Sequence, residues 1–264
     1  MVGIGGLGTH VVQQLALLGV GALTLIDREE LSDSNRNRYV GAWHTDPVPG
    51  FPKVDLGERL VQMIDPDIRV LKVPCSLVSP QAFDAMRSTD LVFGCVDRDG
   101  ARAILNEFCL AYELPYFDLA SDIVHGPASE FGGRVCAVVG GKRCLMCLDV
   151  LDANEVSLDF ATGAQRRDRD AIYGVRPEAL DQGGPSVVSI NGAVASLAVT
   201  EFMAFAVGLR EPRGLLNYYG RRGIVTTAAR EPEAGCYYCT TVRGQLERAE
   251  VERYLAEGVV QNLK

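Results

Sequence analysis

Hydrophobic residues in this chain form two alternating kinds of stretch, short continuous runs and longer runs with a helical period. Continuous runs such as ALTLID (22–27) and TDLVFGCVD (89–97) predict strands covered on both faces. The alternation predicts an α/β fold, a Rossmann-like, mainly parallel sheet flanked by helices. We expect helices at 9–18, 53–63, 98–112 and 186–208, and strands at 22–27, 68–73, 89–97, 114–121 and 132–141.

The first expected helix follows a glycine-rich turn formed by Gly3, Gly5, Gly6 and Gly8. Glycines let backbone amides approach a phosphate at a helix N-terminus, and a carboxylate about 20 residues further on can accept hydrogen bonds from ribose hydroxyls. Asp27 lies 19 residues after Gly8. Glycine-rich turns also occur where a helix simply packs closely on a strand, so this turn alone leaves both interpretations open.

Composition narrows the class of protein. The chain has 264 residues, 47% of them hydrophobic, which is enough for a substantial core. The formal net charge of -8 makes nucleic acid an unexpected partner. We see no secretory signal and no apolar stretch that we expect to span a bilayer, so we expect a cytoplasmic protein that does not bind membranes.

The eight cysteines divide into two groups. Four are scattered among apolar neighbours and predict small buried side chains: Cys75, Cys95, Cys109 and Cys136. The others form two C-x-x-C pairs separated by 88 residues: Cys144 with Cys147, and Cys236 with Cys239. Two such pairs can complete a closed four-sulfur shell around Zn²⁺. The alternative is two unrelated redox or buried pairs, because the separation is longer than a compact zinc ribbon uses.

Polar residues after the second strand supply candidate chemistry for a triphosphate. Asn35 and Arg38 lie in the segment DSNRNRY, and Lys53 begins the next expected helix. A triphosphate needs several cations and a carboxylate for its Mg²⁺, and Asp97 lies where a parallel strand presents ligand groups. Taken singly, Arg38 and Lys53 fit surface ion pairs and Asp97 fits a helix cap. Together they favour a nucleotide site.

These residues resemble the ThiF/MoeB/HesA group of ubiquitin-activating-enzyme-like adenylyltransferases over nearly the whole chain. The motifs of that family are a G-x-G-G-x-G turn, a strand-end Asp, S-N-L-x-R, P-K, C-T-D-N and paired C-x-x-C. The helix DRDGARAILNEFC is also similar to the corresponding helix of the family, through Arg102, Asn106 and Cys109. The matching positions are Gly3 to Gly8, Asp27, Ser34-Asn35 with Arg38, Pro52-Lys53, Cys95-Val96-Asp97 and the four paired cysteines.

The resemblance implies a reaction in which ATP and a C-terminal carboxylate give an acyl-adenylate and pyrophosphate. It implies ATP, Mg²⁺ and Zn²⁺ as cofactors, and a ubiquitin-like protein, a sulfur carrier or a peptide as substrate. Arg38 and Lys53 would stabilise the triphosphate, Asn35 would orient a phosphate oxygen, Asp97 would hold Mg²⁺ and Asp27 would bind the ribose. We expect one homodimeric domain, with a nucleotide-binding half at 1–135, a zinc-stapled half at 136–264 and a crossover loop at 152–185.

Three departures from the family pattern affect these expectations. Only Met1 and Val2 precede the glycine turn, so we expect the missing first strand and N-terminal helix upstream, or a strand supplied by a partner. Arg36 and Arg98 replace the leucine and the asparagine of the family motifs. Some relatives carry a catalytic cysteine in the crossover loop, whereas residues 148–235 contain none, so we expect the enzyme to stop at the acyl-adenylate.

Two other classes of function remain open. An NAD-dependent oxidoreductase would share the glycine turn and the strand-end Asp27, although the cations and the cysteine pairs disfavour it. A non-catalytic, zinc-stabilised scaffold could pair with an active homologue, although Arg38, Lys53 and Asp97 argue against lost activity.

Overall fold

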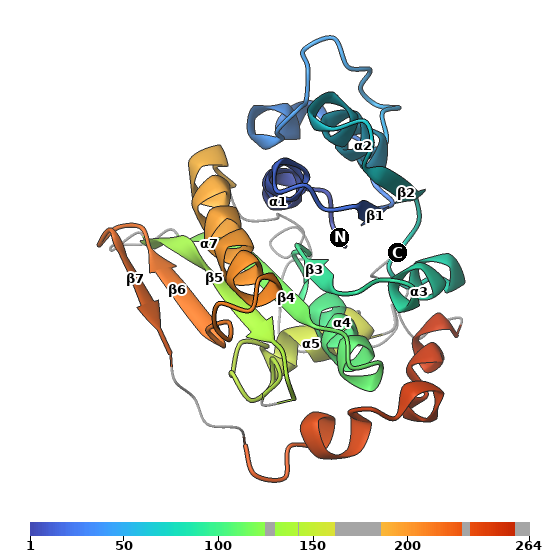
Figure 1. The fold of residues 1–264 in the computed structure, drawn as a ribbon, viewed down its shortest axis with the longest axis vertical. Coiled ribbons are helices and arrows are strands. Elements are labelled where there is room, and N and C mark those ends of the chain that lie inside the picture. The colour runs from blue at the N-terminus through green and yellow to red at the C-terminus, as the bar shows by residue number, and fades with distance from the viewer. Residues whose placement is uncertain (125–129, 142, 162–185, 229–232, 257–264) are drawn as a thin grey trace, which may run out of the picture.

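The computed structural model describes residues 1–124, 130–141, 143–161, 186–228 and 233–256, without the side chains of Asn35 and Val124. In this part of the chain, helices cover both faces of one mixed sheet (Figure 1). The helices are α1 (Gly6–Leu17), α2 (Lys53–Ile64), α3 (Pro80–Arg87), α4 (Asp99–Ala111), α5 (Ala153–Phe160) and α7 (Val188–Ala206), with short helical segments η1 (Asp33–Arg38), η3 (Tyr238–Val242), η4 (Leu246–Ala249) and η5 (Val251–Leu255). The strands are β1 (Ala22–Ile26), β2 (Arg69–Val73), β3 (Val92–Gly94), β4 (Tyr116–Val124), β5 (Glu130–Val138), β6 (Leu215–Tyr219) and β7 (Ile224–Thr227).

Val2 joins the two groups of strands into one sheet. β1 pairs with β2, the other strands follow the order β3-β4-β5-β6-β7, and Val2 forms parallel bridges to Ile26 and Gly94. The amide of Val2 donates to the Phe93 carbonyl at 2.9 Å, and the amide of Cys95 donates to the Val2 carbonyl at 2.8 Å. The chain therefore enters the glycine turn from the centre of the sheet.

The α/β class is confirmed, but the expectation of a mainly parallel sheet holds for only part of it. β1 with β2 and β3 with β4 are parallel, whereas each pair from β4 to β7 is antiparallel. Only residues 125–129 separate β4 from β5, and a parallel connection needs a crossover of a dozen residues or more. The short connection therefore makes β4 and β5 antiparallel.

Alternate residues of β1, β3, β4 and β6 face two different hydrophobic clusters. Leu25, Phe93 and Phe117 pack with α1, α2 and α7, whereas their chain neighbours Ile26 and Tyr116 pack with α3, α4 and the C-terminal segments. This period of two explains why the strands read as continuous apolar runs in the sequence. Both clusters contain residues from before and after position 135, and the division into two halves there stays a prediction.

Helix α7 is the long apolar element of the second half. Among the described helices it alone has the length and composition to cross a membrane, with 19 residues and a mean hydropathy of 1.4. Its Val194 and Ala198 side chains are fully buried in the cluster shared with α1, β4 and β5. The described contacts are those of a helix that covers one face of a sheet (Figure 1).

The glycine turn and α1 touch so closely that one position tolerates no side chain. A Cβ at Gly8 would overlap the carbonyl oxygen of Gly3. We expect Gly8→Ala to lower the free energy of unfolding by about 2–3 kcal/mol, because backbone cannot move aside as a flexible side chain can. Urea unfolding of the wild type and of Gly8→Ala measures the difference in free energy.

Gly21→Ala is the matched control, because a Cβ there would meet nothing within 4 Å and Gly21 is not among the glycines with positive φ. We expect its stability to stay within about 1 kcal/mol of the wild type. Equal free energies of unfolding for Gly8→Ala and Gly21→Ala would contradict the close contact between Gly8 and the Gly3 carbonyl.

Candidate active site and metal centre

The N-terminus of α1 is shaped to receive an anion. Gly5 occupies the N-cap position and no side chain caps the helix, so the first backbone N–H groups point toward the space before it. Gly3 has a φ of +88°, which favours glycine. A Cβ at Gly5 would meet only the Tyr39 hydroxyl, at an ordinary 3.6 Å. Packing demands glycine at Gly3 and Gly8, whereas Gly5 leaves room for a ligand.

Asp27 ties this turn to the end of β1. Its two carboxylate oxygens accept hydrogen bonds from the amides of Ile4 at 2.7 Å and Glu29 at 2.8 Å. Burial raises the pKa of Asp27 above its usual range, while the nearby Lys53 ammonium opposes that shift. Each oxygen retains a further lone pair, so the arrangement is compatible with the predicted contact to ribose.

Lys53 is a buried cation at the first turn of α2. Only 5% of it is exposed, its ammonium pairs with the Glu29 carboxylate, and it lies 5.3 Å from the centre of the Tyr39 ring. Burial alone would lower the pKa of Lys53, but Asp27, Tyr39 and Glu29 outweigh burial and raise it. The side chain therefore carries a fixed positive charge.

Arg38 is a second cation near the N-terminus of α1. Its guanidinium donates to the Ser34 carbonyl at 2.6 Å and lies 5.7 Å from the Tyr39 ring centre, and its aliphatic stem lies beside Gly6. It has no carboxylate partner within the described ranges. Both cations thus lie close to the Tyr39 ring, whose hydroxyl faces Gly5 at the helix N-terminus. Asn35 belongs to η1, but its side chain lies outside the described part.

Asp97 lies just after β3, in the loop that touches the glycine turn. A Cβ at Gly3 would lie 2.7 Å from the Cys95 carbonyl oxygen, so the turn and the loop are in direct contact. The Asp97 carboxylate is exposed and makes no hydrogen bond or ion pair with any residue that the structure describes. The ends of β1 and β3 therefore present Asp27 and Asp97 on either side of the turn.

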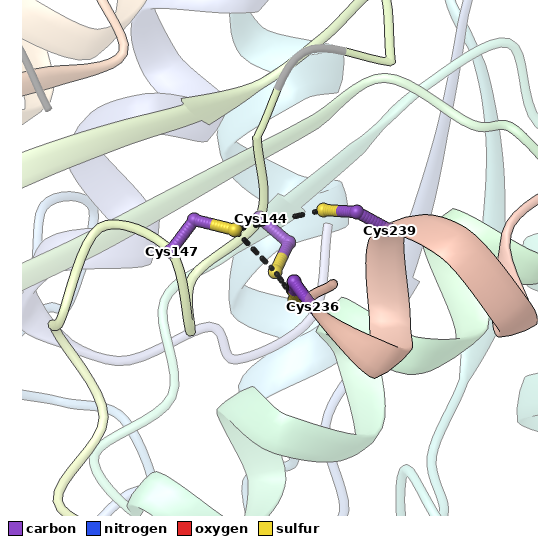
Figure 2. A group of neighbouring side chains, drawn as sticks. All are labelled: Cys144, Cys147, Cys236 and Cys239. Carbon is purple, nitrogen blue, oxygen red and sulfur yellow. Dashed lines mark hydrogen bonds between the residues drawn. The ribbon is translucent and has the colours of Figure 1, made fainter. Parts of the chain in front are cut away.

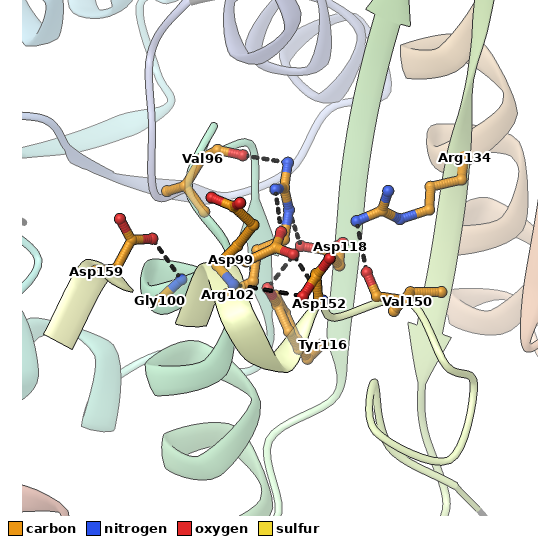
Figure 3. Close-up of polar contacts among 11 residues, drawn as sticks. Val96, Asp99, Gly100, Arg102, Tyr116, Asp118, Arg134, Val150, Asp152 and Asp159 are labelled. Atoms are coloured by element: carbon orange, nitrogen blue, oxygen red, sulfur yellow. Dashed lines mark hydrogen bonds and ion pairs between the residues drawn. The ribbon is translucent and has the colours of Figure 1, made fainter. Parts of the chain in front are cut away.

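A buried polar network supports this loop (Figure 3). Arg102 on α4 donates to the Val96 carbonyl at 2.6 Å and to Asp99 at 2.9 Å, and its guanidinium lies 3.5 Å from Asp118. The Tyr116 hydroxyl donates to the same Asp118 oxygen at 2.9 Å. Because Asp118 is completely buried, the network fixes the backbone immediately before Asp97. The sequence analysis did not identify Asp118, since a single Asp within a strand carries no distinguishing pattern.

The same network fixes the start of the predicted crossover loop. The amide of Asp152 donates to Asp99, and the Asp159 carboxylate on α5 accepts from the amide of Gly100, each at 2.9 Å. These bonds hold residues 152–161 against the N-terminus of α4 (Figure 3). Residues 162–185 of the predicted crossover loop, with the charged RRDRD run, lie outside the described residues.

The two C-x-x-C pairs converge on one point (Figure 2). All four sulfurs lie within 4.8 Å of one another, with Sγ–Sγ distances of 3.7 Å for Cys144–Cys147, Cys144–Cys236 and Cys147–Cys239. A tetrahedron of sulfurs about 2.3 Å from Zn²⁺ has edges of roughly 3.8 Å. The donor set and the spacing fit a closed tetrahedral metal site, and they exclude disulfides within the cluster, whose S–S distance is about 2.05 Å.

Polar groups of neighbouring elements orient the cluster. Asn106 on α4 accepts a hydrogen bond from the amide of Leu145 at 2.9 Å, and Arg243 donates to the Cys239 sulfur at 3.8 Å. Burial would raise the pKa of Cys147, but hydrogen bonds with the Cys144 and Glu233 backbone and with the neighbouring thiols lower it. The cluster links the segment after β5 to the segment around η3, and both segments contact α4.

The sequence profile of the ThiF family matches residues 1–239. The chain belongs to the ThiF family. Molybdopterin-synthase adenylyltransferase of Escherichia coli is 33% identical over 153 residues, 57% of this chain and 58% of that protein. Protein HesA of Leptolyngbya boryana is 28% identical over 211 residues, 80% and 64% of the two chains.

A further ThiF-type relative is the SAMP-activating enzyme E1 of Haloferax volcanii, 30% identical over 148 residues, 56% of this chain and 52% of that protein. The crystal structure of E. coli MccB with ATP superimposes with a TM-score of 0.68 at 19% identity, covering 90% of this chain and 65% of MccB. The chain thus spans about half to two-thirds of these proteins. The MccB likeness confirms the fold.

We expect purified protein to contain about one Zn²⁺ per chain, because a closed four-thiolate shell contributes folding energy. Cys144→Ser should lower the yield of folded protein, whereas Cys75→Ser, outside the cluster, should leave both the yield and the zinc content unchanged. Metal analysis and circular dichroism measure these effects. Well-folded wild-type protein without zinc would contradict the expectation.

Proposed function

We propose that the protein is an ATP-dependent adenylyltransferase that activates the C-terminal carboxylate of a ubiquitin-like protein, a sulfur carrier or a peptide. Membership of the ThiF family supports the class of enzyme, because relatives are named molybdopterin-synthase and ThiS adenylyltransferases. The observation that carries the proposal is the uncapped N-terminus of α1 with Arg38 and Lys53 beside it. Two cations, a helix dipole and a carboxylate placed to hold Mg²⁺ together suit the charge of a triphosphate.

In the proposed reaction, a carboxylate oxygen attacks the α-phosphorus of ATP. The new O–P bond gives the acyl-adenylate, the bond to the bridging oxygen of the β-phosphate breaks, and pyrophosphate leaves with the electron pair. The attacking carboxylate is already ionised at pH 7, so no general base is required. The protein's task is to position the reactants and neutralise the charge that develops on the leaving group.

The described residues divide this task. Lys53 and Arg38 would neutralise the phosphates, and Asn35 would orient a phosphate oxygen. Asp27 would accept from the ribose. Asp97 would hold Mg²⁺, which would neutralise further phosphate charge when bound. Because Glu29 already pairs with Lys53, a bound phosphate would share that cation or displace Glu29 from it.

The remaining features fit around this assignment. The four clustered cysteines would bind Zn²⁺ as a structural ion, without an open coordination position for chemistry. We also propose a cytoplasmic homodimer, a nucleotide-binding half at 1–135, a zinc-stapled half at 136–264 and a crossover loop at 152–185 over the tail of the substrate.

We expect Lys53→Ala and Asp97→Ala each to lower substrate-dependent exchange of pyrophosphate into ATP by about 10²-fold, because a lost charge partner of the transition state costs about 3 kcal/mol. Small carboxylate proteins encoded beside the gene supply the substrates for the assay. Lys72→Ala and Asp67→Ala make the same changes on β2 and in an exposed loop, and should leave exchange unchanged.

Exchange in both site variants at the rate of the wild type would refute the assignment. Wild-type protein that is folded but binds no ATP would favour the non-catalytic scaffold. Binding of NADH in preference to ATP would favour an oxidoreductase.

We expect no covalent thioester between the enzyme and its substrate. Burial raises the pKa of the Cys95 thiol, which disfavours the thiolate that would attack an adenylate. Burial also raises the pKa of Cys109 and Cys136. Reducing and non-reducing gels of enzyme incubated with ATP and the carboxylate protein should look alike. A thiol-sensitive adduct that Cys95→Ala abolishes would prove this wrong.

A further inference from the structure

Helices α1 and α7 meet along a row of polar contacts that ends at the glycine turn. Gln14 donates to Ser196 at 3.1 Å, and His10, one turn closer to the glycine turn, lies against Gly192 of α7, where a Cβ would be 3.3 Å from the His10 Cε1 atom. At the end of the row, Asn191 faces Gly6, where a Cβ would lie 2.7 Å from the Asn191 Nδ2 atom. Asn191 therefore reaches the first residue of α1, next to the proposed phosphate position.

The orientation of the Asn191 amide is fixed by two hydroxyls. Only 1% of Asn191 is exposed. Its Oδ1 accepts from Ser121 on β4 at 2.7 Å, and its Nδ2 donates to Ser186 at 3.0 Å. An amide nitrogen carries two hydrogens, so one N–H remains for an acceptor on the side of α1.

The surroundings of Gly6 show what that acceptor would be. The missing Cβ of Gly6 would also lie 3.2 Å from Arg38 Cγ and 3.3 Å from the Arg38 carbonyl. Asn191 and Arg38 therefore approach the first turn of α1 together, and Gly6 is small enough to admit both. The Arg38 groups nearest Gly6 are its Cγ and its carbonyl oxygen, whereas its guanidinium donates to the Ser34 carbonyl. The donors at this turn are therefore the helix N–H groups and the Asn191 amide, and such donors suit phosphate oxygens.

We propose that Asn191 is a phosphate-binding residue of the nucleotide site, supplying a neutral hydrogen-bond donor from α7 beside the α1 backbone and Arg38. This inference rests on the proposed function, because it needs a nucleotide at the N-terminus of α1. Ser121 and Ser186 act as positioning residues, since they hold the amide with its nitrogen toward Gly6.

Asn191→Asp tests the proposal with little change in volume. The carboxylate can still accept from Ser121, but it replaces the N–H donor with negative charge. We expect calorimetric affinity for ATP and for AMP to fall about tenfold or more, and affinity for adenosine to stay within about twofold. Asn191→Ala removes the donor without adding charge, and should weaken ATP and AMP binding less than Asn191→Asp does.

Asn217→Asp is the matched control, because Asn217 lies on β6 between Leu216 and Tyr218, whose side chains pack with the α7 cluster on the opposite face. It should bind all three ligands as the wild type does. If Asn191→Asp fails to fold, Asn191→Ala provides the test: its affinity for ATP should fall while its affinity for adenosine stays unchanged.

The outcomes separate this inference from the proposed function. ATP binding by the wild type together with unchanged ATP affinity in both Asn191 variants would overturn the inference alone. An equal loss of ATP and adenosine binding would also overturn it, because that pattern indicates general distortion. Failure of the folded wild type to bind ATP would overturn the proposed function and this inference together.

Discussion

The close contact between the glycine turn and α1 is the constraint on which the rest of the site depends. Gly8 lies against the carbonyl of Gly3, so α1 starts directly at the carboxyl ends of the central strands. Val2 carries the chain into this turn from between β1 and β3, and the ends of both strands therefore flank the helix N-terminus. A side chain at Gly8 would push the helix dipole away from the residues that it faces.

The buried charges around the turn are balanced by neighbouring groups of opposite charge. Lys53 keeps its charge because Asp27, Tyr39 and Glu29 compensate for its burial, while Asp27 stays close to the turn through two backbone amides. Arg38 faces the same space and has no carboxylate partner in the described part of the chain. Arg38 and the first N–H groups of α1 therefore remain as donors for the anionic ligand that we propose.

Two structural centres hold the opposite face of the sheet in place. The Arg102–Asp118 pair fixes the loop before Asp97, and Asn106, one turn further along α4, binds the segment that carries Cys144. α4 thus connects the proposed Mg²⁺ ligand to the cysteine cluster. The cluster can remain structural and still influence the site, because both depend on the placement of one helix.

The sequence by itself determined the elements whose patterns are local. Periodicity located α1, α2, α4 and α7 to within a few residues and located β1 to β5, and the C-x-x-C spacing indicated the cluster that the structure assembles. It missed α3, although Ser79 caps that helix and Pro80 follows at its first position, which is a recognisable start signal. It also missed α5, β6 and β7. Residues 224–227 of β7 are all exposed and show no buried face, whereas β6 buries Leu215 and Leu216.

Only the tertiary structure decided the direction of the strands and the partners of the polar residues. The antiparallel β4–β5 pair follows from its short connection, and hydrophobic period alone does not encode direction. The sequence did not indicate Asp118 or Asn191, because each is defined by a contact that only the fold creates. Asp118 contacts Arg102, and Asn191 contacts Gly6. Local patterns fix which face of an element is buried, but contacts between distant segments arise only when the packed core brings them together.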